Sequence, residues 1–170
     1  YKNIVTVGLR TRDFEWTAQF IADFREKLPP EERANAHAYN LAALAHEQKN
    51  FAAALAALQT VEFTDLSYAL GAKIIQLKCW FRMGEEEALF SLIDTTKKWL
   101  LRQSKMSEHG RRANLHFLKI LRPLFQAVQS EKWMRPADFR KKMAVLREKI
   151  AILEPIANKE WLEEAISFAP

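Results

Sequence analysis

The stretch 37-HAYNLAALAHEQKNFAAALAALQ-59 decides how this chain folds. Alanine and leucine dominate on both sides of a polar interruption, His46-Glu47-Gln48-Lys49-Asn50. These two residue types have high helix propensities, whereas a short polar interruption is typical of the connection between two helices. The stretch therefore predicts two helices joined by a tight turn, and their small side chains allow the two helices to approach closely.

The polar interruption also has a chemical interpretation, because it lacks one residue of the His-Glu-x-x-His pattern of zinc peptidases. That pattern needs two imidazoles one turn apart in the middle of a helix, and the amide of Asn50 is a poor zinc ligand. Cys79 lies among apolar residues, and the four glycines are too scattered for a phosphate-binding loop. We predict no catalytic residue, no metal site and no cofactor, and we expect the protein not to be an enzyme.

The composition extends the helical prediction to the whole chain. Its 170 residues include only 4 Gly and 6 Pro, with 49% hydrophobic and 28% charged residues, which favours an all-α protein. Candidate starts are Asp13, Pro30, Thr64-Asp65, Ser107 and Pro136, and Gly84 is a candidate stop. Pro123 is expected to bend or divide a helix over about 108–129. The expected helices are 2–10, 14–28, 30–49, 51–61, 66–83, 85–102, 108–129, 136–153 and one containing Trp161, Leu162, Ala165 and Ile166.

The small residues recur at a regular interval. Ala38-x2-Leu41-Ala42-x2-Ala45 precedes Phe51 and Ala54-x3-Leu58, while Ala88-x3-Leu92 lies 34 residues after the last element. Thr17-x3-Ile21 occupies the same place 37 residues earlier. In this register, residues 1–102 resemble three degenerate tetratricopeptide (TPR) units, and the chain is similar to bacterial TPR-like proteins of unknown function.

The resemblance implies a right-handed α-solenoid of antiparallel helix pairs, with an irregular α-helical bundle as the alternative. We expect three TPR-like pairs over 1–105 and a C-terminal helical cap over 106–170. The chain begins inside a helical pattern without Met, so we expect it to be part of a longer protein. With one cysteine, and neither a signal pattern nor a long apolar run, a cytoplasmic location is the simplest expectation.

A TPR-like array implies a non-catalytic scaffold that binds a segment of a partner protein on its concave face. Candidate contacts on the 30–49 helix are His37, Asn40 and Glu47. Trp133, in the turn SEKWMRP, is a contact point if it is exposed.

Charge gives an alternative function. Residues 1–85 carry ten basic and ten acidic side chains, whereas 97–149 carry fifteen Lys and Arg against four acidic residues. This bias is compatible with binding to nucleic acid or another polyanion, to an acidic protein, or with a solvated rim. A helical enzyme subunit is a further alternative. The candidate basic contacts are Lys98, Arg102, Arg111, Arg112, Arg140 and Lys141.

Overall fold

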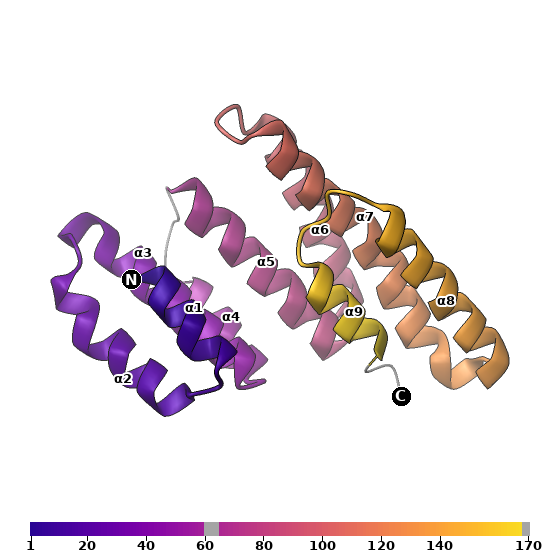
Figure 1. Ribbon diagram of the computed structural model, residues 1–170, viewed down its shortest axis with the longest axis horizontal. Helices are drawn as coiled ribbons and strands as arrows, with labels where there is room; N and C mark the ends of the chain where they lie inside the picture. Colours follow the sequence, from indigo (N-terminus) through magenta and orange to yellow (C-terminus); the bar gives the residue numbers. More distant parts are fainter. Residues whose placement is uncertain (60–64, 168–170) are drawn as a thin grey trace. The chain divides into compact units, whose positions relative to one another are not determined.

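The computed structural model describes residues 1–59 and 65–167, and helices dominate these ranges (Figure 1). The prediction of an all-α protein is confirmed. The described helices are α1 (Lys2–Arg10), α2 (Phe14–Phe24), the 3₁₀ turn η1 (Arg25–Lys27), α3 (Pro30–Glu47), α4 (Phe51–Gln59), α5 (Leu66–Met83), α6 (Glu86–Arg102), α7 (Glu108–Ser130), the 3₁₀ turn η2 (Glu131–Trp133), α8 (Pro136–Ile152) and α9 (Lys159–Ser167).

Side-chain caps begin several helices where the sequence predicts them. The Asp13 carboxylate accepts a hydrogen bond from the Trp16 amide at 3.2 Å, and that of Asp65 accepts from the amides of Ser67 and Tyr68 at 2.9 Å. The Ser107 hydroxyl accepts from the Gly110 amide at 3.1 Å. Each cap satisfies backbone donors that the first turn of a helix leaves unpaired. The predicted contribution of Thr64, and the predicted end of the fourth helix at residues 60–61, lie outside the described residues.

Two local predictions are corrected, and a third is narrowed. Helix α2 ends at Phe24 and tightens into η1, since Leu28 precedes a proline and is extended (φ −80°, ψ 149°). Helix α3 ends at Glu47, two residues before the predicted end at residue 49, and Lys49 itself takes a left-handed conformation (φ 62°). Helix α7 is unbroken from Glu108 to Ser130, so of the two effects predicted for Pro123, a bend or a division, the division does not occur. Buried side chains on both sides of this proline, Leu121, Leu124 and Phe125, hold the helix in place.

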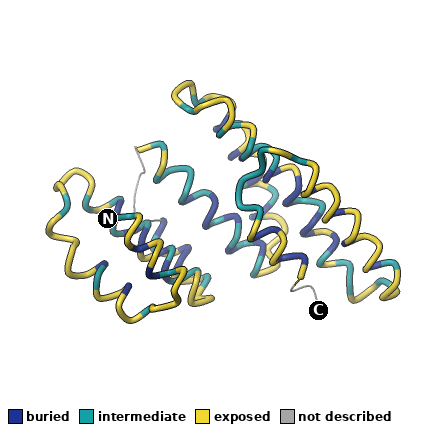
Figure 2. Tube along the Cα trace, in the orientation of Figure 1, coloured by how far each residue is buried: buried dark blue, intermediate teal, exposed yellow. Residues whose placement is uncertain are grey.

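The chain divides into two units, Tyr1–Glu85 and Glu86–Pro170. In the first unit α3 packs on α1, α2, α4 and α5. The buried positions of α3 are two residues apart along the helix, so they lie on opposite sides of it: Ala36, Ala38, Asn40, Ala42 and Leu44. Figure 2 shows this burial along the trace.

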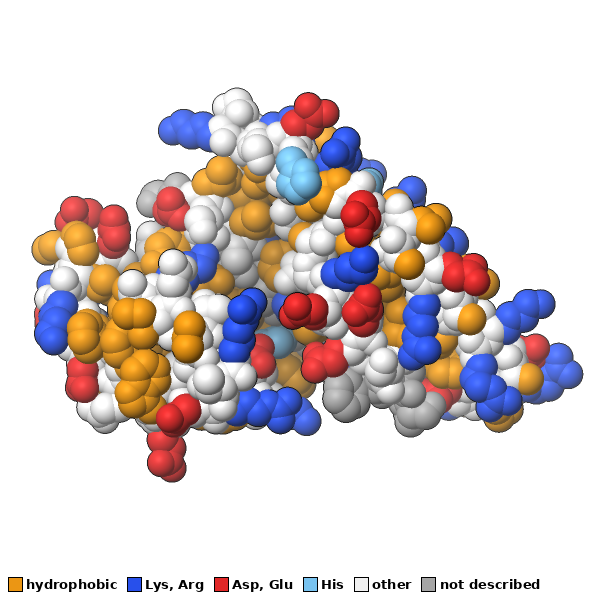
Figure 3. Space-filling model, viewed as in Figure 1, with side chains coloured by type: hydrophobic (Ala, Val, Ile, Leu, Met, Phe, Trp, Pro, Cys, Tyr) orange, Lys and Arg blue, Asp and Glu red, His pale blue; other side chains and the backbone are white. Residues whose placement is uncertain are grey.

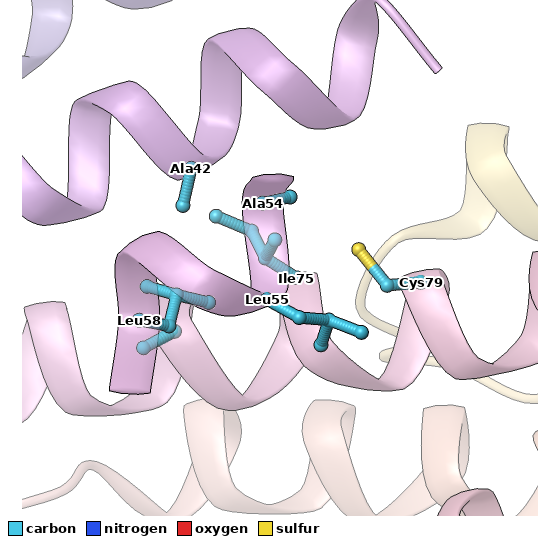
Figure 4. Close-up of a cluster of buried hydrophobic side chains, with 7 residues drawn as sticks. Ala42, Ala54, Leu55, Leu58, Ile75 and Cys79 are labelled. Atoms are coloured by element: carbon cyan, nitrogen blue, oxygen red, sulfur yellow. The ribbon is translucent and has the colours of Figure 1, made fainter. Parts of the chain in front are cut away.

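The core of the first unit has two parts. One lies between α3, α4 and α5 and is made of small and aliphatic side chains, drawn in Figure 4: Ala42, Ala54, Leu55, Leu58, Ala72, Ile75 and Cys79. The other joins α1, α2 and α3 through Val5, Ile21 and Leu44. Ala42 and Ala54, two alanines of the repeat pattern, are fully buried at the contact of α3 with α4, whereas Ala45 is partly buried.

In the second unit α6 packs on α7, and α7 packs on α8 and α9. Its core contains large aromatic side chains: Phe117 is fully buried and meets Trp161 edge to face at 6.2 Å, and Phe125 meets Phe90 at 5.7 Å. The last helix, predicted to contain Trp161, Leu162, Ala165 and Ile166, is α9, and all four residues are buried in it. Because α6 packs on α7 inside this unit, the unit begins at Glu86, whereas the sequence placed a domain boundary at 105/106.

Within each unit, every described helix packs on the next helix in the chain. This order is what stacked helix pairs produce, and an irregular bundle can produce it too. None of the described helices combines the length and apolar character that crossing a membrane requires.

Candidate functional site

The candidate contacts on α3 do not form a surface. Asn40 is 1% exposed, and its side-chain amide donates to the carbonyl of Ala36 at 2.6 Å, so the prediction that Asn40 meets a partner is corrected. His37 is half-buried, and its Nδ1 is buried without a hydrogen-bond partner. Burial, together with the nearby Arg25 guanidinium, lowers the pKa of His37. The α3 candidates do not form a binding surface because other helices cover α3 on two sides, which leaves little of the helix accessible to a ligand.

Glu47 lies at the exposed end of α3. Its carboxylate is 3.1 Å from Nδ1 of His46, and this hydrogen bond, with the nearby charges of Lys78 and Arg12, lowers the pKa of Glu47. Asn50 has left the helix, and its side-chain oxygen accepts from the Ala53 amide at 3.2 Å at the start of α4. The zinc-like sequence is therefore a helix end and a helix start. Over residues 1–59 and 65–167, groups of three or more potential ligands (His, Cys, Asp, Glu) are absent.

Cys79 is fully buried between α3, α4 and α5. Desolvation raises the pKa of its thiol to about 11, against the opposing effect of Lys78. A thiol with this pKa is protonated at neutral pH and is a poor nucleophile. Cys79 thus acts as a small apolar core residue.

The first basic cluster predicted from sequence lies at the junction of α6 and α7. Lys98, Arg102 and Arg112 are exposed there. Arg111 is different, because its Nη2 donates to the carbonyls of Gln103 at 2.6 Å and Met106 at 3.4 Å. Its guanidinium therefore fixes the turn between the two helices instead of facing a ligand.

The second basic cluster lies on α8 and on η2 before it. Arg140 and Lys141 are both exposed, as are Lys142, Arg147 and Lys149 further along the same helix. Lys and Arg side chains gather over this end of the unit, at the right of Figure 3. Trp133 in η2 is 81% exposed, and the ammonium of Lys132 lies 5.3 Å from the centre of its ring.

The two basic clusters do not combine into one site. Helices α7 and α8 pack together and are joined by the short segment 131–135, so they run antiparallel. Arg112 lies near the start of α7, whereas Arg140 lies beside its last turns. At 1.5 Å per residue, these positions are about 20 Å apart along the helix axis. A single phosphate or carboxylate cannot reach both clusters.

Two depressions flank α8. One has a volume of about 860 Å³, lies between α8, α9 and η2, and includes Phe139, Arg140 and Met143 in its lining. The other has a volume of about 460 Å³ and lies between α7 and α8, beside Met134, with Lys141 in its lining. Arg140 and Lys141 are adjacent in sequence but face different depressions, because successive helix residues point about 100° apart.

Several residues of these depressions were not among the sequence candidates, notably Val145 and Lys149. A signal for them exists in the sequence. Positions 138, 141, 142, 145, 146 and 149 follow the three- and four-residue spacing of one helix face. The contribution of Pro123 from α7 depends on tertiary packing, which that spacing does not indicate.

Other basic groups of this unit are held by internal contacts. Arg122 donates to both oxygens of Asp94 at 3.1 Å and covers the ring of Phe90 at 4.4 Å. Arg135 pairs with Asp138 at 2.7 Å, and Lys159 pairs with Glu154 at 3.4 Å. The excess positive charge on the surface therefore comes mainly from α8 and from the α6–α7 junction.

Comparison of the chain with protein-family models, with curated proteins and with solved structures gives no match. The TPR resemblance thus remains a prediction from the sequence pattern.

Proposed function

We propose that this chain is a non-catalytic protein-binding module built of TPR-like helix pairs, and that a partner binds at the η2–α8 surface, residues 131–152. The observation that carries the proposal is Trp133, which is 81% exposed at the start of this surface. Tryptophan is among the residues that contribute most to protein interfaces, because it buries a large apolar area at a small entropy cost.

The solenoid is part of this proposal. Its support is the packing of each helix on its sequence neighbour and the buried alanines between α3 and α4, the best-preserved repeat unit. The burial of Asn40 speaks against α3 as the partner-binding helix, so we place the partner on η2–α8 instead of on a concave face that includes α3.

Binding of nucleic acid or another polyanion is the competing function, and the exposed cations of α8 favour it. The apolar side chains beside α8 favour a protein partner over nucleic acid. The depressions beside α8 contain apolar side chains, among them Phe139, Met143 and Val145, which have no complement in a phosphate backbone. A protein segment offers carboxylates and apolar side chains together.

The test compares affinity capture by the tagged chain and by Trp133→Ala, after nuclease treatment and with quantification by mass spectrometry. We expect a set of proteins whose capture falls about tenfold or more in Trp133→Ala, as for an interface hot spot. Trp16→Ala is the matched control, because Trp16 is a 47% exposed tryptophan of the first unit and its loss should leave these proteins bound.

Two results would contradict the proposal. In the first, Trp133→Ala and Trp16→Ala change capture equally. In the second, captured material is lost on nuclease treatment, while salt-titrated binding to DNA or RNA is strong and depends on the α8 cations.

A further inference from the structure

One stripe of α8 faces a groove that the structure forms with α7 and with Met134, the residue after η2. The groove, here called the lysine groove, has a volume of about 460 Å³. Its lining follows the spacing of one helix face on α8 and adds one residue from α7 and one that follows η2: Asp138, Lys141, Lys142, Val145, Leu146, Lys149, Pro123 and Met134.

The lining combines apolar surface with cations. Pro123, Met134, Val145 and Leu146 supply the apolar part, and Val145 remains 44% exposed. An exposed β-branched side chain between two buried positions of the same helix, Met143 and Leu146, offers apolar area that a ligand can cover.

The charges of the groove are one-sided. Lys141, Lys142 and Lys149 face one carboxylate, that of Asp138, which Arg135 already neutralises at 2.7 Å. Lys142 donates to the Ser130 hydroxyl at 3.3 Å, a neutral partner that leaves its charge uncompensated. Over the described residues, these three lysines have no salt bridge.

We propose that the lysine groove binds an acidic amphipathic helix of a partner protein; this proposal rests on the protein-binding function proposed above. The apolar face of such a helix covers Val145, Leu146 and Met134, and its carboxylates pair with the lysines. From position 138 to 149 the stripe extends about 17 Å, or three helical turns, which matches the length that helix-in-groove recognition uses.

The probe is a fluorescent 15-residue peptide with leucines on one helical face and glutamates beside them, titrated against the complete 170-residue chain by anisotropy. A scrambled peptide of the same composition is the control for charge alone. We expect the amphipathic peptide to bind at least about fivefold more tightly than the scrambled one, and to weaken as salt rises.

Charge reversal tests the cations. The triple variant Lys141→Glu, Lys142→Glu, Lys149→Glu should weaken binding of the amphipathic peptide about tenfold or more. Each exposed lysine–glutamate pair contributes modestly to affinity, but the variant loses three such pairs and replaces them with repulsion between glutamates. The matched control reverses three other lysines of the second unit, Lys97, Lys98 and Lys105, with the same change in net charge. It should change affinity less than about threefold.

A neutral substitution tests the apolar floor. Val145→Gln should weaken binding about threefold or more, since it removes apolar contact area without changing charge. Ile152→Gln is its control, because Ile152 is 79% exposed on the same helix but does not line the groove. Circular dichroism spectra of all variants check that the helices are retained.

The proposal is overturned if the scrambled peptide binds as tightly, if the two triple variants lose equal affinity, or if Val145→Gln has no more effect than Ile152→Gln. Absence of peptide binding together with Trp133-dependent capture rejects this groove but leaves the protein-binding function in place. Binding to phosphatidylserine vesicles or to DNA oligonucleotides that depends on the three lysines, without peptide binding, also rejects the proposal.

Discussion

The two units of the chain pack their helices by different means. In the first unit, the contact between α3, α4 and α5 is built from alanines such as Ala42 and Ala54, with leucine and isoleucine around them. In the second unit, Phe117 and Phe125 fill the space between helices and meet Trp161 and Phe90. Small side chains allow close helix contact, whereas aromatic side chains hold helices apart and fill the gap.

The units also differ in charge. Ten basic and ten acidic side chains balance in residues 1–85, whereas residues 86–170 carry sixteen basic and eleven acidic ones. The units divide at Glu85 and Glu86, and the positive excess lies inside the second unit, in residues 97–149. The first unit is therefore balanced in charge and encloses one of its helices, α3, whereas the second unit is basic and leaves much of α8 exposed.

The largest expected effect of a single substitution is in the second unit. Phe117→Ala should lower the free energy of unfolding by about 3–5 kcal/mol, because it removes a fully buried ring and leaves a cavity beside Trp161. Urea denaturation measures the loss, and hydrogen exchange locates it in peptides from α7 and α9. Trp133→Ala, which truncates an 81% exposed ring of the same unit, should cost little. Equal losses for both variants would contradict the assignment of Phe117 to the core.

An intermediate loss of stability is expected in the first unit when a small buried side chain is replaced by a larger one. Ala54→Leu should destabilise by about 1–3 kcal/mol, since the added carbons meet α3 and α5 where no space remains. Ala56→Leu is the control, because Ala56 is exposed on the same helix and leucine is also a good helix former. Urea denaturation measures the free energy of unfolding of both variants. If Ala54→Leu is neutral, the alanine contact is looser than the structure indicates.

The sequence predicts the helices better than it predicts the candidate site. Capping residues such as Asp13 and Ser107, and the left-handed Gly84, fix helix ends by local backbone chemistry, which is legible from neighbouring residues. Arg140 and Lys141 were recognisable as exposed basic residues from composition alone. The lysine groove was not, because its lining includes Pro123 from another helix, and only tertiary packing brings α7 against α8.

Asn40 is the most instructive error. A polar residue on a helix is normally exposed, and the sequence prediction followed that rule. In the structure its amide bonds to the carbonyl of Ala36 one turn earlier, so the polar group is satisfied inside the unit. The burial of α3 on two sides follows from its packing on four helices, and the helix's mixture of alanine and polar residues gives no clear one-sided pattern.

The smallest expected effect concerns pH and the first unit. Hydrogen bonding to His46 lowers the pKa of Glu47 below its ordinary value of 4.5, so the folded state binds this proton less readily than the unfolded state. The stability that Glu47 contributes is therefore complete above about pH 4.5 and is lost as the pH falls through the lowered pKa.

Glu47→Gln should consequently lower the free energy of unfolding at pH 7 by about 0.2–1 kcal/mol, the range of exposed ion pairs, since Glu47 is 48% exposed. The difference from the unsubstituted chain should shrink as the pH falls below 4.5. Urea denaturation at pH 7, 5 and 3 measures it. Glu164→Gln, at an exposed glutamate of α9, is the control in the second unit. If the loss of stability in Glu47→Gln is the same at pH 3 as at pH 7, the carboxylate charge does not stabilise the end of α3. The pH dependence of Glu47→Gln in the first unit would then not differ from that of Glu164→Gln in the second.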